Sequence, residues 1–403
     1  MTRTQPAVRL DGGRVAHHDR VVSESIGVAD GFVSDAANTD FRLDLRDHLI
    51  FPGLINAHDH LQLNNVPPLE AEEPFANSYE WIAAMESHRS TPTVRAATSV
   101  PSETRYWHGA LKNILSGVTT VAHHDPRTPA LDDVDFPVNT PGIGWCHSLC
   151  LGAGGDGGLP QYGPPVRQSF DDTPTQMPWI IHLAEGIDGV ARAELNQLDE
   201  LGCLASNTVL VHCVGLTSQD IETVIAHGAG VVWCPSSNLR MFGRTLDPAR
   251  LNEAGRLALG TDSRLTGSRD LIDELRVAAD CSGLPAHELV RLVTERAAAI
   301  LRLADRGRLQ LGSRADFVIL RDSADPYEAL LETTRADLRA VVRNGVPVLA
   351  DPDFAAWFAH RGVETTAVLL DGRPKLMAQP LARILVDRDV ICLEPGLELT
   401  AQQ

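Results

Sequence analysis

Apolar runs of strand length alternate with stretches of helical period through the middle of the chain. The helical stretches cover residues 80–88, 104–117, 273–283 and 285–303, and the last of these is expected as one continuous helix. Parallel strands are buried on both faces and are joined by crossover helices, so this alternation predicts parallel βα units. The seven apolar runs stand at residues 49–57, 117–123, 142–149, 179–185, 208–214, 230–235 and 257–262.

The expected fold class is therefore α/β, with a distorted (β/α)8 barrel of the TIM type. Such a barrel carries its site at the carboxyl ends of its strands. Only seven strand runs are visible. The segment 151–178, which is rich in Gly and Pro and has no helical period, is where a missing strand or a substrate loop is expected.

Both ends of the chain have a different texture, with short strand runs separated by turn residues. In the C-terminal part, Asn344-Gly345 is a strong signal for a two-residue hairpin. The first 50 residues cannot close a core alone, so we expect the two ends to form one sheet domain together. The predicted domains are residues 1–50 as the first part of the β-sandwich, 51–306 as the barrel, and 307–403 as its second part with a C-terminal extension.

The charge balance is acidic and narrows the choice of partners. Lys and Arg number 35 against 53 Asp and Glu, which gives a formal net charge of -18. Such a surface repels nucleic acid and anionic membranes, so neither is expected as a partner. A small neutral or cationic molecule fits better as a substrate. The charge does not decide whether the protein forms a homo-oligomer.

Cysteine usage and the first residues point to a cytoplasmic protein. Seven cysteines occur without any CxxC pair, which indicates neither a disulfide framework nor a thiolate zinc site. The opening residues lack the apolar run of a signal peptide, and no stretch approaches the length of a membrane span.

Histidine and aspartate residues stand where four of the predicted strands end. His58 and His60 are two apart on a strand, so both imidazoles project to the same face and can reach one ion. The run 179–185 brings His182, and the run 257–262 brings Asp262. We expect His58, His60, His182 and Asp262 to hold a metal ion.

Three neutral imidazoles and one carboxylate suit a borderline divalent ion, Zn²⁺ first and Fe²⁺ as the alternative. Such an ion lowers the pKa of a bound water from about 16 to about 7 and so supplies a nucleophile near neutral pH. The chain has only two lysines, Lys112 and Lys375, and neither falls at the end of a predicted barrel strand. A bridging carbamylated lysine is thus excluded, and a single ion is predicted.

Glu185 follows His182 by three residues, just past the strand end. There it can act as a proton donor beside the metal site, and a solvated loop glutamate is the alternative. Further polar and aromatic residues near the strand ends are candidates for contact with substrate: Gln62, Asn64, His123, His124, Trp145, His147, Asn238 and Arg240.

The segments FPGLINAHDH, IIHLAEG, LVHC and LALGTDS together resemble the amidohydrolase superfamily. HLAE in particular resembles its adenosylhomocysteine, guanine and triazine aminohydrolase branch. The resemblance implies a barrel with a β-sandwich, one zinc or iron ion, and attack of water on a carbon bonded to nitrogen. It further implies that His212 hydrogen-bonds the attacking water or the substrate, that Glu185 transfers protons, and that Asp262 takes the proton of the water besides binding the metal.

The function predicted from these residues is that of a metal-dependent hydrolase, an aminohydrolase or deaminase that acts on a planar heteroaromatic or nucleobase-like substrate. An alternative within enzymes is hydrolysis of a cyclic amide or of another non-peptide C–N or aryl leaving-group bond at the same metal. A binding protein that kept the fold and lost turnover is the alternative from another class.

Overall fold

The computed structural model describes residues 6–35, 39, 41–152 and 161–400. All seven apolar runs contribute parallel strands, as predicted. Two of them form one sheet, in the order β8-β9, and five form another, in the order β10-β11-β12-β13-β14. The arrangement is a TIM-barrel-like α/β fold, with the strands β8 (Leu54–Asp59), β9 (Val118–His123), β10 (Gly144–Ser148), β11 (Trp179–Leu183), β12 (Thr208–His212), β13 (Gly230–Trp233) and β14 (Leu257–Leu259).

The ends of β14 and β8 approach each other at the candidate ligands. The backbone N–H of Asp262 donates to the carbonyl of His58 at 3.1 Å. Gly260 makes this approach possible, because a Cβ there would lie 2.7 Å from the Cβ of His58. The strand that was expected within 151–178 is absent from the described part of that segment, since residues 161–178 contain a helix and no strand. Instead, Asn139 forms a parallel bridge with Thr120 of β9.

The first apolar run, residues 49–57, is divided between two sheets at Gly53. A Cβ at Gly53 would lie 2.4 Å from the hydroxyl of Thr119, so only glycine fits where the chain turns from one sheet into the other. The half before the turn, β7 (His48–Pro52), pairs with strands of the C-terminal region. The half after it is β8, which carries the two histidines to the carboxyl end of the barrel strands.

Three of the four predicted helices are confirmed, as α1, α3 and α10. The single helix expected over 285–303 is wrong, because it is broken at Val293 and Thr294 into α11 and α12. The carbonyl of Val293 accepts from the N–H of Ile55 at 2.8 Å, so pairing with β8 replaces a helical hydrogen bond. The helices of the barrel region are α1 (Ser78–His88), α2 (Pro92–Ser99), α3 (Ser102–Leu115), α4 (Leu149–Gly152), α5 (Val166–Asp172), α6 (Gly189–Glu200), α7 (Ser218–His227), α8 (Pro235–Phe242), α9 (Ala249–Glu253), α10 (Leu271–Ser282), α11 (Ala286–Leu292) and α12 (Glu295–Ile300).

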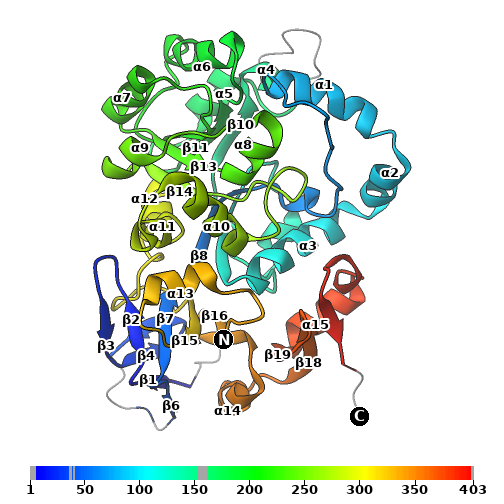
Figure 1. Cartoon of the computed structure of the whole chain (residues 1–403). Coiled ribbons are helices and arrows are strands. Elements are labelled where there is room, and N and C mark those ends of the chain that lie inside the picture. The colour runs from blue at the N-terminus through cyan, green and yellow to red at the C-terminus, as the bar shows by residue number, and fades with distance from the viewer. Residues whose placement is uncertain (1–5, 36–38, 40, 153–160, 401–403) are drawn as a thin grey trace.

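Strands from the two ends of the chain lie together at one end of the molecule, where blue and orange strands adjoin in Figure 1. One sheet has the order β20-β18-β19-β17-β16-β15-β7-β2-β3 and thus joins both ends, and the other has the order β5-β4-β1-β6. The strands are β1 (Val8–Asp11), β2 (Arg14–Ala16), β3 (Val21–Ser23), β4 (Ile26–Ala29), β5 (Phe32–Ser34), β6 (Arg42–Asp44), β15 (Phe317–Arg321), β16 (Ala340–Arg343), β17 (Val346–Ala350), β18 (Thr365–Leu370), β19 (Arg373–Ala378) and β20 (Leu397–Leu399). Three further helices accompany them, α13 (Pro326–Glu332), α14 (Ala355–His360) and α15 (Gln379–Asp387).

A shared apolar core joins these two sheets. Val8 and Val28 of the smaller sheet and Ile50, Phe317 and Val342 of the larger one belong to the same buried cluster. The predicted hairpin at Asn344-Gly345 is confirmed: it links β16 to β17, and both residues have positive φ values, as a type I′ turn requires. Among the described residues, no helix is long and apolar enough to span a membrane.

Candidate metal centre

Strained backbone marks the ends of three barrel strands. Ala184 after β11, His212 and Cys213 at the end of β12, and Asp262 after β14 all have positive φ values between 51° and 73°. Residues other than glycine rarely adopt this left-handed conformation, which costs about 1 to 3 kcal/mol each and clusters at functional sites. The strain turns the side chains of these strand ends toward the space above the barrel.

The side chains of His58, His60, His182 and Asp262 meet there, all of them buried. The Nε2 atom of His182 lies 3.2 Å from Nε2 of His58 and 3.3 Å from Nε2 of His60. The Oδ1 atom of Asp262 lies 3.9 Å from Nε2 of His58 and 3.8 Å from Nε2 of His60. Ligands at about 2.1 Å from a tetrahedral zinc ion are about 3.4 Å apart, so these separations fit four donors around one ion.

Hydrogen bonds on the far side of two imidazoles fix where their protons are. His60 donates from Nδ1 to Asp125 Oδ2 at 2.6 Å, and His182 donates from Nδ1 to the carbonyl of His147 at 2.8 Å. When both rings are neutral, as metal ligands are, each Nε2 atom carries a lone pair, and the two lone pairs face each other. Two facing lone pairs repel unless a cation lies between them, so the donor set fits a divalent metal ion.

Asp125 controls the charge of His60. Burial lowers the pKa of His60, but the Asp125 carboxylate outweighs it and raises that pKa to about 9. Burial likewise works against ionisation of Asp125, yet His60 and the hydroxyl of Tyr162 hold its pKa well below the usual value. Asp125 is therefore an ionised carboxylate of the kind that orients metal-binding histidines.

Asp262 is also prepared as an anionic ligand. Its Oδ2 accepts from the hydroxyls of Ser237 at 2.8 Å and Thr266 at 2.7 Å, and its Oδ1 accepts from the N–H of Ser263 at 2.7 Å. Burial would raise the pKa of Asp262, but the histidines nearby and these two hydroxyls lower it. The oxygen that faces His58 and His60 is Oδ1.

Glu185 and His212 lie next to each other beside this cluster. Glu185 Oε1 lies 3.5 Å from Nε2 of His212. His212 Nδ1 donates to Asn238 Oδ1 at 2.8 Å, and Asn238 in turn donates to Thr245, so Nε2 of the neutral His212 ring can accept a proton. Burial raises the pKa of Glu185, which keeps a proton on this carboxyl to higher pH than on a solvated glutamate. The pair can therefore hold and deliver a proton next to the cluster.

A buried carboxyl supports the turn that carries Glu185. Glu194 on α6 accepts from the backbone N–H of Ala184 at 2.6 Å and from the hydroxyl of Tyr79 at 3.0 Å. Burial raises the pKa of Glu194 to about 7. The carbonyl of Glu185 accepts from the N–H of Ser78 at the start of α1, so the turn after β11 is held from two sides.

His124 lies closer to the cluster than its position in the sequence suggests. Its Nε2 lies 2.9 Å from the carbonyl of Cys146 and 3.2 Å from that of Ile180. Its Nδ1 is buried without a partner among the described residues. Donor atoms of His58, His60, His124 and His182 all lie within 4.8 Å of one another, and those of His58, His212 and Asp262 form a second such group.

The other candidates for substrate contact lie in several environments. His147 and Trp145 are half-buried around Tyr162, with ring centroids 5.5 and 6.1 Å from the tyrosine ring. Gln62 donates to Asp125 at 2.6 Å. His123 packs edge-on against Tyr106.

Two of these candidates are engaged within the protein. Asn64 is buried and donates to Asp59 at 2.9 Å. Arg240 donates to the carbonyl of Thr266 at 3.0 Å and pairs with Glu70 at 3.3 Å. The side chain of Arg240 is 41% exposed, so this arginine still reaches solvent.

A buried ion pair beneath the cluster escaped the sequence analysis. Lys112 on α3 has no exposed surface and donates to Asp59 at 3.0 Å, Asn64 at 2.9 Å and Thr261 at 3.1 Å. Asp59 lies between the two histidines in sequence and points away from them, because alternate residues of a strand face opposite sides. The position of Asp59 between the two histidines could have indicated a buried carboxylate behind them. No feature of the sequence indicates that its partner is Lys112. Asp125 and Tyr162 were missed because they are 37 residues apart and meet only in the fold.

The chain is similar to known proteins over most of its length. A model of the Amidohydrolase family matches residues 176–367. The chain is 27% identical over 376 residues to 5-methylthioadenosine/S-adenosylhomocysteine deaminase 1 of Syntrophus aciditrophicus, covering 77% of this chain and 81% of that protein. It is 26% identical over 371 residues to the 5-methylthioadenosine/S-adenosylhomocysteine deaminase of Halobacterium salinarum, covering 78% and 84%.

Solved structures share the fold. An adenosine deaminase from Xanthomonas campestris with bound zinc superposes with a TM-score of 0.67 at 20% identity, over 88% of this chain and 97% of that one. An atrazine chlorohydrolase from Arthrobacter aurescens complexed with zinc gives a TM-score of 0.68 at 20% identity, over 85% and 95%. The predicted resemblance to the amidohydrolase superfamily is thus confirmed, and so is the predicted class of protein, a hydrolase that acts on non-peptide carbon–nitrogen bonds.

Proposed function

We propose that the chain is a mononuclear metal-dependent aminohydrolase, a deaminase that replaces the exocyclic amine of a planar heteroaromatic substrate by oxygen. One observation carries this proposal: imidazole nitrogens and a carboxylate oxygen converge at the spacing of metal ligands, beside a carboxyl group with a raised pKa. The first feature suits a divalent cation, and the second suits transfer of a proton to a leaving group.

In this proposal His58, His60, His182 and Asp262 hold one Zn²⁺, with Fe²⁺ as the alternative. The ion supplies a nucleophile from water near neutral pH. Asp125 holds the ring of His60 in the orientation that directs Nε2 at the ion, and Ser237 and Thr266 do the same for the carboxylate of Asp262.

The remaining steps are proton transfers by side chains of this chain. Asp262 takes the proton of the attacking water, and Glu185 protonates a ring nitrogen of the substrate. The amine then receives the proton that Asp262 took and leaves as ammonia, while the added oxygen gives up its remaining proton to Glu185 and becomes the carbonyl oxygen. His212 donates a hydrogen bond to the attacking water or the substrate from Nε2 when that atom is protonated, and Asn238 fixes its ring.

The substrate class follows from the relatives and from the residues around the strand ends. The curated relatives are named for deaminases of 5-methylthioadenosine and S-adenosylhomocysteine. We therefore expect an aminated purine or a related ring, bound as a small molecule. Trp145, His147, His123, His124, Gln62, Asn64, Asn238 and Arg240 remain the proposed substrate-side residues, and Trp145 and His147 are the ones that lie around a half-buried aromatic group.

The test is a screen of aminated purines, pyrimidines, pterins and triazines for release of ammonia by the zinc-loaded protein. We expect one ring class to release stoichiometric ammonia, and metal analysis to find about one ion per chain. Glu185→Gln should lose the activity and keep the metal, whereas Glu200→Gln, which changes an exposed glutamate of α6, should keep both. Product formation without ammonia would replace the deaminase by hydrolysis of another bond, and absence of bound metal would favour a non-catalytic binding protein.

We also propose the finer division of the fold that the sequence suggested. The barrel, residues 51–306, is a distorted (β/α)8 barrel, and residues 1–50 and 307–403 form a β-sandwich with a C-terminal extension. The pairing of β7 with β15 and the apolar core common to both end sheets support this division.

A further inference from the structure

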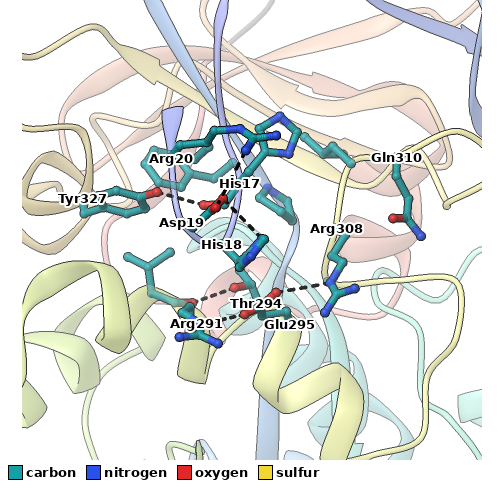
Figure 2. Close-up of a pocket in the computed structure, with 16 residues that line it drawn as sticks. His17, His18, Asp19, Arg20, Arg291, Thr294, Glu295, Arg308, Gln310 and Tyr327 are labelled. Carbon is teal, nitrogen blue, oxygen red and sulfur yellow. Dashed lines mark hydrogen bonds and ion pairs between the residues drawn. The ribbon is translucent and has the colours of Figure 1, made fainter. Parts of the chain in front are cut away.

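A second polar cavity lies at the opposite end of the barrel strands from the candidate metal centre (Figure 2). Its volume is about 220 Å³. Phe51 and Pro52, which end β7, are part of its wall, whereas His58 and His60 stand at the far end of β8. Five residues lie between Pro52 and His58, and six steps of extended chain correspond to about 20 Å. The cavity is thus a separate place from the proposed reaction site.

Segments far apart in the sequence build this cavity. They are the turn 17–20 between β2 and β3, the junction 290–295 of α11 and α12, the turn 307–310 and the helix α13. The junction is open because the helix breaks at Thr294. Gly307 packs against this break, and a Cβ there would lie 2.8 Å from the carbonyl of Thr294. The helix break therefore places Arg291 and Glu295 in the wall of the cavity.

The floor of the cavity is apolar. Phe51, Val290 and Leu309 are buried, and each has at most 5% of its surface exposed. The ring of Tyr327 meets the ring of Phe51 edge-on at 6.4 Å, so a planar surface borders the floor. Such a floor favours the apolar body of a small molecule.

The carboxylates at the rim already have cationic partners. Figure 2 shows Arg291 and Arg308 reaching Glu295 from opposite sides, with Oε1 2.5 Å from Arg291 Nε and Oε2 3.2 Å from Arg308 Nε. Asp19 pairs with His18 at 3.5 Å and with Arg20 at 3.8 Å. Three arginines of the lining thus stand against two carboxylates.

Donor capacity remains in excess. A guanidinium has five N–H groups, and Arg308 uses one of them on Glu295, while Arg20 makes one longer contact with Asp19. The two side chains are 60% and 70% exposed, so their free N–H groups can turn to an incoming molecule. The cavity therefore offers cationic donors above an apolar floor, on a chain whose net charge is -18.

We propose that this cavity binds a small organic anion, with its carboxylate or phosphate group on Arg20 and Arg308 and its planar apolar body against Leu309 and the ring of Tyr327. The site is independent of the proposed deaminase reaction. Anions are disfavoured over most of this acidic protein, but the lining of this cavity carries three arginines against two carboxylates and therefore attracts them.

Isothermal titration of the full-length, metal-loaded protein tests this site with phenyl phosphate and benzoate as probes. Benzyl alcohol is the neutral control, and inorganic phosphate tests whether the apolar body matters. We expect one binding event per chain for at least one aromatic anion, with benzyl alcohol and inorganic phosphate each at least about tenfold weaker. The stronger of the two aromatic anions tells whether the natural ligand carries a phosphate or a carboxylate. Equal binding of benzyl alcohol, or no binding of either anion, overturns the proposal.

Variants of exposed arginines locate the site without threatening the fold. Arg308→Gln and Arg20→Gln should each weaken the aromatic anion about tenfold. Arg321→Gln is the matched control: it removes an exposed arginine at the end of β15 for which the described residues offer no ion pair, and it should leave binding unchanged. A uniform effect of all three variants would mean only a general loss of charge.

Binding at the metal centre is the competing explanation for any aromatic anion. Asp262→Ala changes that centre and leaves the cavity untouched, so the anion should still bind to this variant. If Asp262→Ala abolishes binding and the arginine variants do not, the anion sits at the metal centre and the proposed site is wrong.

Discussion

The two ends of the barrel treat charge in opposite ways. At the carboxyl ends of the strands, the imidazoles and carboxyls are buried, and hydrogen bonds from behind fix two of the rings: Asp125 fixes His60, and Asn238 fixes His212. At the other end, Arg20 and Arg308 are exposed and only partly paired. Catalysis needs side chains whose protonation state and orientation are fixed. Binding of an anion needs only hydrogen-bond donors that can turn toward it.

The largest effect should come from removing the anionic ligand of the metal centre. Asp262→Ala takes away the oxygen that faces His58 and His60, so we expect loss of bound metal and no detectable turnover. Ammonia release and metal content measure the two effects. Asp172→Ala, at an exposed aspartate of α5, is the control, and a fully active Asp262→Ala variant would contradict the proposed ligand set.

Glu185→Gln should keep the metal and lower kcat by about 100- to 10,000-fold, the usual cost of a missing general acid or base. Because the acid form must be present, the activity of the unaltered protein should fall as pH rises through the raised pKa of Glu185. The residual activity of the glutamine variant should lack this alkaline limb. A pH profile of kcat that is the same in both proteins would exclude Glu185 as the proton donor.

Glu194→Gln tests the support of the same turn through stability. The folded-state pKa of Glu194 is about 7 against 4.5 for the unfolded chain, so the unfolded state loses its proton first as pH rises. This group therefore lowers the free energy of unfolding between about pH 4.5 and 7, by about 3 kcal/mol in all. Urea unfolding at pH 5 and pH 7.5 measures the free energy of unfolding, which should fall less between these pH values in Glu194→Gln than in the unaltered protein. The same fall in both proteins would mean that Glu194 is ionised at both pH values.

Asp125→Asn should weaken zinc about 10- to 100-fold, since outer carboxylates fix and polarise the histidine ligands. Competition with a chelator measures this affinity. Asp132→Asn, which changes an exposed partner of Arg127, should leave zinc affinity as it is. Equal affinity in all three proteins would show that His60 needs no carboxylate to bind the ion.

The smallest effect is expected at the other end of the barrel. Arg308→Gln should change kcat/KM of the deaminase by less than about twofold in the absence of an added anion, because about 20 Å separates the cavity from the metal centre. Steady-state kinetics checks this. A larger change in kcat/KM would show that the cavity is coupled to the metal centre and that the two ends of the barrel do not act separately.

Much of the fold was readable from local patterns. All seven apolar runs are strands, and the Asn344-Gly345 turn is a hairpin, because strand burial and left-handed turns leave their mark within a few residues. The helix break at Thr294 was not readable. The apolar period continues through it, and the interruption comes from Ile55, which lies more than two hundred positions away and donates to the carbonyl of Val293.

The same division applies to the site. The sequence by itself determined which donors stand at strand ends, since the two-residue period of β8 and the HLAE and GTD motifs are local features. Only the tertiary structure decided which groups stand behind them: Asp125 with Tyr162, Asn238 with His212, and Lys112 under Asp59. Hydrogen bonds depend on distances of a few ångströms between residues that are far apart in the chain, and no periodic pattern encodes those distances.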